Sequence, residues 1–392
     1  MNCPVCNSTE LSLFLRRARV PVHQNMVFRE QRAAVAIERG NLELAVCSEC
    51  GFVFNTAFEP AKVRYGPDYD NTQVCSPFFE NYVDALVTYL LTEKGLHDST
   101  IVEVGCGKGY FLRKLVEDEK ANNTGYGFDP SYVGPEVDCG GRLHFEKRFY
   151  DSASASIPAD VVICRHVIEH VPRPIPLLRS IRQALAHAAA PKVFFETPCV
   201  EWILRNQVVW DFFYEHCSYF SADSLSVAMQ QAGFQVQNVQ HVFGDQYLWL
   251  EATIGTNTPG GKPTRASEVA VLCQNFGTME SDLVIQWRAN LRELTESGPV
   301  ALWGGAKGVT LANLVDPERE LVACVVDLNP QKQGGFLPGT GHPIVNYLDL
   351  PLFQVKSAIQ MNPNYAAENL ALLHEAQLEV TLIDPINWRV IQ

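Results

Sequence analysis

The sequence contains no long apolar run, no excess of basic charge and no apolar leader at its beginning. A membrane-spanning helix needs about 20 consecutive, mostly apolar residues, and no stretch of the chain approaches that length. The opening residues, MNCPVCNSTE, have neither the basic nor the apolar region of a signal peptide. We therefore expect a cytoplasmic protein without a membrane partner.

Basic residues are scarce, with 31 Lys and Arg against 44 Asp and Glu and a formal net charge of −13. Binding to a nucleic-acid backbone rests on Lys and Arg, so we expect no nucleic-acid partner. A small phosphorylated ligand needs only one local pocket and stays possible. Because 47% of the 392 residues are hydrophobic and 19% charged, the chain has enough apolar material for two or three packed domains.

Twelve cysteines in a chain without an export signal indicate thiols or metal ligands rather than disulfides. Two C-x-x-C pairs, CPVC and CSEC, contain Cys3, Cys6, Cys47 and Cys50. Four thiolates suit tetrahedral Zn²⁺. The strand-like text between the pairs favours a structural zinc site over a redox pair or chance cysteines. We predict a zinc-ribbon-like domain over residues 1–60.

The rest of the chain alternates strand-like and helix-like segments. Residues 61–260 give a helix, then strands such as STIVEVGCG, GYGFDP, ADVVICRHV and PKVFFETP separated by helical text. This order predicts an α/β fold with a mostly parallel, doubly wound sheet. Residues 261–392 repeat the theme as a smaller Rossmann-like unit, and the Gly- and Pro-bearing stretch 254–264 is the predicted linker.

A glycine-rich turn follows the strand STIVEVGCG. In VEVGCGKGYF, Glu103 precedes Gly105, Gly107 and Gly109, and a helix begins at the last of these. Glycines at such a turn allow a ligand close to the backbone, and the helix N-terminus favours its anionic end. Asp129 ends the next strand and would hold ribose hydroxyls. The early acidic residue and the E-x-G-x-G-x-G form favour S-adenosylmethionine over a dinucleotide.

These motifs together resemble the class I S-adenosylmethionine-dependent methyltransferases. With YEHCSYFS, ALWGGAKGVT and VVDLNPQKQGGFLPGTGHPI, the chain more narrowly resembles three-domain sugar C-methyltransferases that act on nucleotide-linked 4-keto-deoxysugars. That family joins a four-cysteine zinc domain, a methyltransferase domain and a Rossmann-like domain. The resemblance implies S-adenosylmethionine as cofactor and a nucleotide sugar as substrate. We place Tyr150 and Arg165 near the adenine and methionine ends of the cofactor as further candidates.

The aromatic stretch FFYEHCSYFS contains the candidate catalytic group. Methylating a carbon next to a ketone requires a base near the C–H proton and a donor for the enolate oxygen. The resemblance implies that His216 is the base and that Glu215 orients it. Family members have a tyrosine where this chain has Phe213, so we consider Tyr214, and Tyr69 from the N-terminal side, for the donor.

The segment HVIEH fits the inverted zinc-peptidase pattern with His166 and His170. That pattern needs a continuing helix, but three prolines follow almost at once, at positions 172, 174 and 176. A loop at the carboxyl edge of the sheet is the better interpretation. We therefore predict that His170 assists catalysis and that His166 is solvated or caps the core.

The last segment has GGAKG followed by Asp327, which partly imitates a dinucleotide fingerprint. The glycine spacing differs from G-x-G-x-x-G, so we do not expect bound NAD. We expect this part to close the substrate cleft or hold a nucleotide-sugar phosphate through Lys307, or to act as a scaffold only. O- or N-methylation of a sugar or other small metabolite is the alternative reaction. A binding or assembly protein without catalysis is the alternative class.

Overall fold

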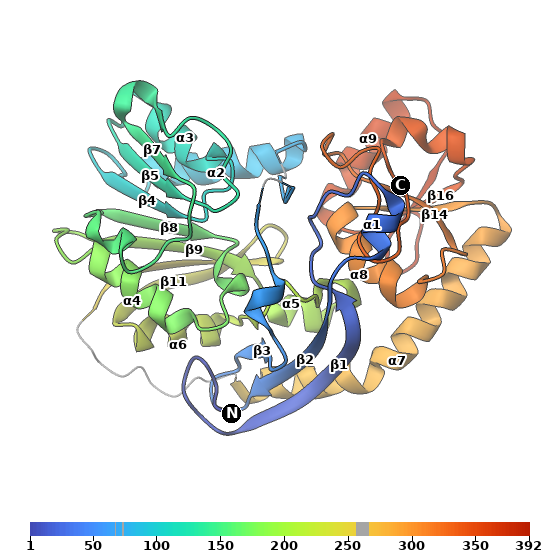
Figure 1. Cartoon of the computed structure of the whole chain (residues 1–392), viewed down its shortest axis with the longest axis horizontal. Coiled ribbons are helices and arrows are strands. Elements are labelled where there is room, and N and C mark those ends of the chain that lie inside the picture. Colours follow the sequence, from blue (N-terminus) through green and yellow to red (C-terminus); the bar gives the residue numbers. More distant parts are fainter. Residues whose placement is uncertain (67, 73, 256–265) are drawn as a thin grey trace.

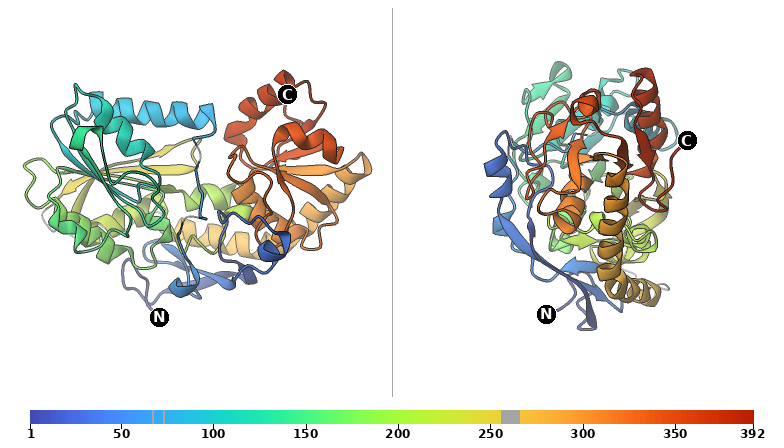
Figure 2. Two further views of the ribbon diagram at one scale, coloured as in Figure 1. Left: turned by 45° about the horizontal axis from the view of Figure 1, so that its top comes forward. Right: turned by 90° about the vertical axis from the view of Figure 1, so that its right-hand side faces the viewer.

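The computed structural model describes residues 1–66, 68–72, 74–255 and 266–392. Two α/β units lie side by side, and a curved N-terminal β-ribbon runs beneath one and up against the other (Figure 1). The second view shows helix α2 of the first unit pointing toward the second unit (Figure 2). Most of the predicted linker, 254–264, falls outside the described residues.

The N-terminal sheet has four strands in the order β1-β2-β3-β10. Strands β1 (Leu11–Pro21) and β2 (Arg39–Cys47) form a long antiparallel ribbon, with helix α1 (Gln31–Val35) near its tip. Strand β3 (Val53–Asn55) pairs with β2, and β10 (Ser218–Tyr219) pairs with β3. Since β10 belongs to FFYEHCSYFS, this sheet draws in a segment more than 150 residues away in sequence.

The central unit has an eight-stranded sheet in the order β11-β12-β9-β8-β4-β5-β7-β6. Its five inner strands are parallel, while β6 and β12 run antiparallel to their neighbours. The predicted parallel, doubly wound fold is therefore confirmed, with a mixed edge that we did not predict. The strands are β4 (Thr100–Val104), β5 (Thr124–Phe128), β6 (Val137–Asp138), β7 (Leu143–Glu146), β8 (Val161–Arg165), β9 (Lys192–Pro198), β11 (Phe234–Val242) and β12 (Tyr247–Ile254).

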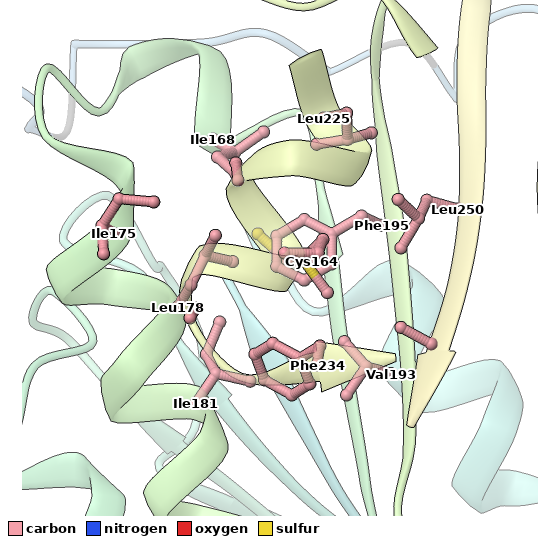
Figure 3. Packing of buried hydrophobic residues seen from close by; sticks show 14 of the residues in the cluster. Cys164, Ile168, Ile175, Leu178, Ile181, Val193, Phe195, Leu225, Phe234 and Leu250 are labelled. Atoms are coloured by element: carbon pink, nitrogen blue, oxygen red, sulfur yellow. The ribbon is translucent and has the colours of Figure 1, made fainter. Parts of the chain in front are cut away.

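Side-chain alternation along the strands builds a core on each face of this sheet. Ile101 of β4 packs toward α2 and α3, whereas Val102 and Val104 pack toward α4 and α6. Figure 3 shows the second layer, where Cys164 and Phe195 meet Leu178 of α4. The helices of this unit are α2 (Pro77–Thr92), α3 (Tyr110–Glu117), α4 (Pro174–Ala184), α5 (Val200–Arg205) and α6 (Ala222–Gln231).

The C-terminal unit has a parallel five-stranded sheet in the order β15-β14-β13-β16-β17. Its 31-residue helix α7 (Ala266–Glu296) extends far beyond this unit, and its first half packs on α5, β1 and β2. A buried cluster therefore joins all three parts of the chain, with Phe14, Phe212, Phe276 and Leu302 among its members. The remaining elements are β13 (Val300–Trp303), α8 (Gly305–Val315), β14 (Val322–Val326), β15 (Ile344–Val345), β16 (Ser357–Gln360), α9 (Ala366–Glu375) and β17 (Thr381–Ile383).

Candidate functional site

The glycine-rich turn lies between β4 and α3, at the carboxyl edge of the central sheet. Gly105, Gly107 and Gly109 all have positive φ, between 54° and 76°. A Cβ on Gly105 would meet a methyl carbon of Val167 at 2.1 Å, whereas a Cβ on Gly107 would enter open space. The turn therefore needs glycine for its backbone, and at Gly107 it leaves the backbone accessible to a ligand.

Two acidic residues face this turn. Asp129 braces it, because its Oδ2 accepts a hydrogen bond from the Gly107 amide at 2.9 Å. Its Oδ1 accepts from the Ser131 amide at 2.7 Å. Glu103 is 3% exposed, and its Oε2 has no hydrogen-bond partner among the described residues. Burial raises the pKa of Glu103 to about 7, and the charge of Arg165 offsets only part of this shift.

A cavity of about 280 Å³ opens above the turn, lined by both acids and by Tyr65, Phe149 and Tyr150. Besides Glu103 Oε2, the buried hydroxyl of Tyr150 has no hydrogen-bond partner within the described ranges. An unpaired buried polar atom is costly unless a ligand or water pairs with it. These atoms fit a polar, cationic cofactor with a nucleoside part, as S-adenosylmethionine is.

Arg165 also lines this cavity, but its guanidinium is already engaged. It donates to both carboxylate oxygens of Glu196 at 3.3 Å and lies over the Phe111 ring at 4.3 Å. Arg165 therefore supplies positive charge beside Glu103 while remaining paired to Glu196.

A second, smaller cavity of about 150 Å³ shares Tyr69, Asn71, His166 and His170 with the first. His216 and Glu215 line it from the segment that precedes β10. The structure thus brings Tyr69, His170, Glu215 and His216 together at the junction of the two cavities. These four residues lie far apart in the sequence, between positions 69 and 216.

The carboxylate of Glu215 does not orient His216, contrary to our expectation. Its Oε1 lies 3.0 Å from His23 Nδ1, and its Oε2 accepts from the Gln24 amide at 2.7 Å. His23 Nε2 accepts from the Arg64 amide at 3.0 Å, so Nδ1 carries the hydrogen that Glu215 receives. Glu215 is 1% exposed and is held as an acceptor by the N-terminal ribbon.

The imidazole of His216 packs between His170, at 4.8 Å between ring centroids, and Phe213, at 4.1 Å. Burial holds the pKa of His216 well below its ordinary range, and neighbouring His170 and His166 lower it further. His170 Nδ1 lies 3.1 Å from the Glu215 carbonyl oxygen. The same nitrogen lies 3.0 Å from the Tyr65 hydroxyl oxygen, so Tyr65 and the Glu215 backbone together hold the His170 ring.

The two candidate tyrosines have different surroundings. Tyr69 lines both cavities and is 8% exposed. Burial raises the pKa of Tyr69 well above its ordinary value, and the charge of Glu215 adds to this shift. Tyr214 is fully buried against Gly40, and its hydroxyl accepts from the Glu59 amide at 2.8 Å. Tyr214 therefore points into the N-terminal ribbon, and our assignment of it to the catalytic group is wrong.

The H-x-x-E-H segment does not form a peptidase helix. Only a short 3-10 turn, Ile168–His170, follows β8. His166 Nε2 lies 2.6 Å from Glu196 Oε1, in a buried charged group that also includes Arg165. Burial lowers the pKa of His166, but the charges and hydrogen bonds of Glu196 and Glu169 together outweigh it and raise that pKa to about 9. His166 is thus an ion-pair partner rather than a solvated residue.

A third cavity, of about 230 Å³, lies against the C-terminal unit and shares Asn25, Asn71, Tyr247 and Lys307 with the second. We expected Lys307 to be available to an anion. It is instead paired with Asp211, at 2.6 and 2.7 Å to the two carboxylate oxygens.

Asp327, at the carboxyl end of β14, lines the third cavity with Lys332. The Lys332 ammonium lies 2.8 Å from Asn25 Oδ1 and 3.6 Å from Asp327 Oδ2. Lys332, which our sequence analysis did not single out, is therefore the basic group beside Asp327.

The four N-terminal cysteines converge, with their sulfur atoms all within 4.8 Å of one another. The Cys3–Cys50 and Cys6–Cys47 sulfur distances are 3.6 and 3.5 Å. Sulfur atoms around a tetrahedral zinc ion, at Zn–S of about 2.3 Å, lie roughly 3.8 Å apart. The cluster therefore fits zinc, and it lies at the end of the ribbon rather than beside the cavities.

Sequence reasoning missed the contribution of the N-terminal ribbon to the site. His23, Gln24 and Asn25 follow β1. His23 and the Gln24 amide bind the Glu215 carboxylate, and Asn25 lines the second cavity. The local signal was the polar run HQN, residues 23–25, which comes shortly after the strand and before the first glycine of the chain. Such a run equally describes an exposed loop, so the pattern did not single it out.

Comparison with known proteins agrees with this arrangement. Residues 78–239 match a family described as a methyltransferase domain, and residues 272–375 match the C-methyltransferase C-terminal domain. The ubiquinone biosynthesis O-methyltransferase of Serratia proteamaculans is 32% identical over 133 residues, which are 32% of this chain and 51% of that protein. The Yersinia enterocolitica protein of the same description is 30% identical over 129 residues, 31% of this chain and 50% of the relative.

The chain thus spans about half the length of the curated relatives that it matches. Among solved structures, magnesium protoporphyrin IX methyltransferase from Synechocystis PCC 6803, with bound SAH, is similar with 19% identity and a TM-score of 0.35. The similar region covers 46% of this chain and 84% of that protein.

The two matches therefore assign a methyltransferase domain to residues 78–239 and a C-methyltransferase C-terminal domain to residues 272–375. The pairing of the two matched domains fits a C-methyltransferase in particular. Helices that could cross a membrane are absent from the described part of the chain.

Proposed function

We propose that the protein transfers a methyl group from S-adenosylmethionine to a carbon atom of a nucleotide-linked keto-deoxysugar. The observation that carries this proposal is the row of three adjoining cavities. The first lies over the glycine-rich turn, the second contains the histidines, and the third lies against the C-terminal unit. A nucleotide sugar is elongated enough to place its sugar in the second cavity and its nucleotide in the third.

His216 is the proposed base. S-adenosylmethionine, when bound, supplies an electrophilic methyl group on a positively charged sulfur. His216 is neutral at pH 7 because its pKa is depressed, so it accepts the proton from the carbon next to the ketone. His170, in contact with the His216 ring and held through Nδ1 by the Glu215 carbonyl, assists in the transfer.

Tyr69 is the proposed donor to the enolate oxygen. Because its pKa is raised, its hydroxyl keeps the proton at neutral pH. The carboxylate of Glu215 lies beside it and is fixed by His23 and the Gln24 amide. In a cavity this enclosed, one fixed donor contributes strongly to stabilising developing negative charge.

In the third cavity, Lys332 and Asp327 are the proposed nucleotide contacts. Lys332 supplies the positive charge for a phosphate group, and Asp327 at the strand end suits ribose hydroxyls. We further propose that Cys3, Cys6, Cys47 and Cys50 hold a structural zinc ion. Four thiolates leave no open position on the metal, so this site takes no part in the reaction.

O-methylation is the second candidate, and two observations favour it. The curated relatives are described as O-methyltransferases. In addition, Phe213 places an apolar ring, without a hydroxyl group, against His216. An O-methyltransferase would use the same base on a sugar hydroxyl and would need no carbon acid.

Proton NMR in D₂O tests the proposal. The enzyme is incubated with S-adenosylhomocysteine and a panel of nucleotide-linked 4-keto-deoxysugars. We expect the proton next to the ketone to exchange, and His216→Ala to slow exchange by about 100-fold or more, the usual contribution of a general base. Exchange by the variant at the wild-type rate would remove His216 from this role. No exchange in any sugar, with intact cofactor binding, would favour O-methylation.

The pH dependence gives a second readout. Because the pKa of His216 is depressed, the acid limb of the exchange rate should lie below pH 6.5, the ordinary value for histidine.

Metal binding is the main alternative role for the two histidines. Donor atoms of Glu169, His170 and His216 lie within 4.8 Å of one another, close enough to hold a divalent cation. We expect EDTA, added at the start of the assay, to leave the exchange rate unchanged. A loss of exchange with EDTA would show that a bound metal, and not a free histidine base, supports the reaction.

A further inference from the structure

The outer side of the N-terminal ribbon contains a cavity that the proposed reaction does not use. It has a volume of about 430 Å³ and lies between β1, α7 and α8. Figure 1 shows α7 running alongside β1, and the two elements are in contact. Phe213 and Gln24 form part of its wall. Phe213 also lines the catalytic cavity, and the Gln24 amide holds Glu215, so the two cavities share a wall.

Four arginines line this cavity: Arg16, Arg17, Arg19 and Arg39. Its one acidic lining residue among those described is Glu280, which is paired with Arg17 at 2.6 Å. The guanidinium groups of the other three arginines have no carboxylate partner in the described parts of the chain. In a protein with a net charge of −13, this is a local concentration of uncompensated positive charge.

The backbone holds these arginines in place. The ribbon register shifts between Arg17 and Val20, and Arg19 at this bulge has a φ of 55°. Bulges re-aim side chains, and a left-handed backbone at a non-glycine residue is strained. Arg39 donates to the carbonyls of Arg19 and Gly339, both at 2.9 Å. Burial lowers the pKa of Arg39, and the charge of Arg19 lowers it further, so the two cations oppose each other at close range.

We propose that this groove binds an organic phosphate, with the phosphate on Arg16, Arg19 and Arg39. Guanidinium groups bind phosphate oxygens in pairs, and an anion would relieve the repulsion between the cations. The volume exceeds the need of a lone phosphate ion. Val284 and Ile285, the latter 64% exposed, provide an apolar wall for the organic part. Gln24 lines this cavity, and its amide also positions Glu215. An occupant would therefore contact a residue that shapes the second cavity, and this contact suits a regulatory ligand.

Isothermal titration of the full-length protein with inorganic pyrophosphate and with UDP tests this site. The test variant is Arg16→Ala/Arg19→Ala, whose side chains are exposed and make no hydrogen bond or ion pair within the described parts of the chain. Arg32→Ala, an exposed arginine outside the cavity, is the matched control. Lys332→Ala removes the basic group of the third cavity, where a nucleotide is proposed to bind for the reaction. Thermal melting checks that each variant is folded.

We expect pyrophosphate to bind the wild-type protein and Arg32→Ala alike, and the double variant at least tenfold more weakly. Binding should weaken between 50 and 200 mM salt. UDP should show one class of sites that Lys332→Ala removes and another that the double variant removes. Unchanged affinities in the double variant, or loss of all binding in Lys332→Ala, would overturn the proposal without touching the proposed reaction.

Discussion

At the residue scale, the two buried carboxyl groups of the site differ in what surrounds them. Glu215 receives hydrogen bonds at both oxygens, from His23 and from the Gln24 amide. Glu103 Oε2 has no hydrogen-bond partner among the described residues, and the pKa of Glu103 is raised to about 7. Burial without a hydrogen-bond donor favours the protonated form of a carboxyl group, which accounts for the shift at Glu103. Glu215 is thus held by hydrogen bonds within the protein, whereas Glu103 leaves one oxygen to pair with a ligand.

This difference predicts that Glu103→Gln stabilises the ligand-free protein at high pH. The folded-state pKa of about 7 exceeds the value of about 4.3 for an unfolded glutamate, so folding is progressively disfavoured as pH rises between them. The full cost is present above pH 7. We expect the variant to melt a few degrees higher than wild type at pH 8 and at a similar temperature at pH 4.

The same variant should bind S-adenosylhomocysteine about tenfold more weakly. Glu119→Gln, at an exposed position, is the control for both measurements. Equal melting shifts at both pH values would show that the pKa of Glu103 in the folded protein is not raised above its unfolded value.

Tyr69 and Tyr214 provide a matched pair of variants. Tyr69→Phe removes the proposed enolate donor and should slow proton exchange by about 100-fold, as loss of one oxyanion donor does. Tyr214→Phe removes a buried hydrogen bond to the Glu59 amide and should cost about 1 kcal/mol of stability. Its exchange rate should stay within about twofold of wild type. The reverse pattern, measured by NMR exchange and urea unfolding, would restore Tyr214 to the catalytic group.

At the element scale, the short strand β10 links the N-terminal sheet to the second cavity. It pairs with β3, and His216 lies two residues before it. The Cys47–Cys50 turn lies between β2 and β3, so the cysteine cluster fixes the strand with which β10 pairs. A structural metal in a small sheet contributes folding energy directly. The cluster can therefore affect catalysis without touching the substrate.

Cys47→Ser/Cys50→Ser should release the zinc and loosen β3 and β10 together. We expect metal analysis to give about one zinc per wild-type chain and none in the variant, because two thiolates bind zinc weakly. Proton exchange should fall and proteolysis near the ribbon should increase. Cys139→Ser, outside the cluster and outside the lining of the three cavities, should keep both zinc and activity. Full activity in a zinc-free, folded variant would separate the cluster from the site.

At the scale of the whole molecule, α7 makes the three parts interdependent. Its first half packs on the N-terminal ribbon and α5, and its second half packs on α8 and β13. Phe276 meets Phe212 at 5.0 Å between ring centroids, in the cluster that crosses all three parts. The boundaries predicted near residues 60 and 260 separate sequence patterns, but the packing crosses both.

Phe276→Ala should therefore destabilise the molecule as a whole. Removing a buried phenylalanine costs about 3–5 kcal/mol. We expect urea unfolding, followed by tryptophan fluorescence and by far-UV circular dichroism, to give one coincident transition that shifts to lower urea. Val271→Ala, on the same helix but 58% exposed, should shift it little. Two separate transitions, with only one moved, would indicate independent units.

The sequence determined the features that rest on local patterns. Cysteine spacing predicted which four sulfur atoms converge, and the turn after β4 had to be glycine because its φ angles are positive. Strand and helix periods gave the order of elements in both α/β units. Each of these depends on residues close together in sequence, where backbone geometry and side-chain period decide the outcome.

Only the tertiary structure decided which side chains of FFYEHCSYFS face the cavity. Outside a regular element no period fixes side-chain direction, and the pairing of β10 with β3 turns Tyr214 into the ribbon and His216 into the cavity. The partner of Glu215 is His23, 192 residues away, and Lys307 is taken by Asp211, 96 residues away. Such contacts arise because packing of the ribbon, α7 and both units brings distant segments together, and no local pattern encodes that packing.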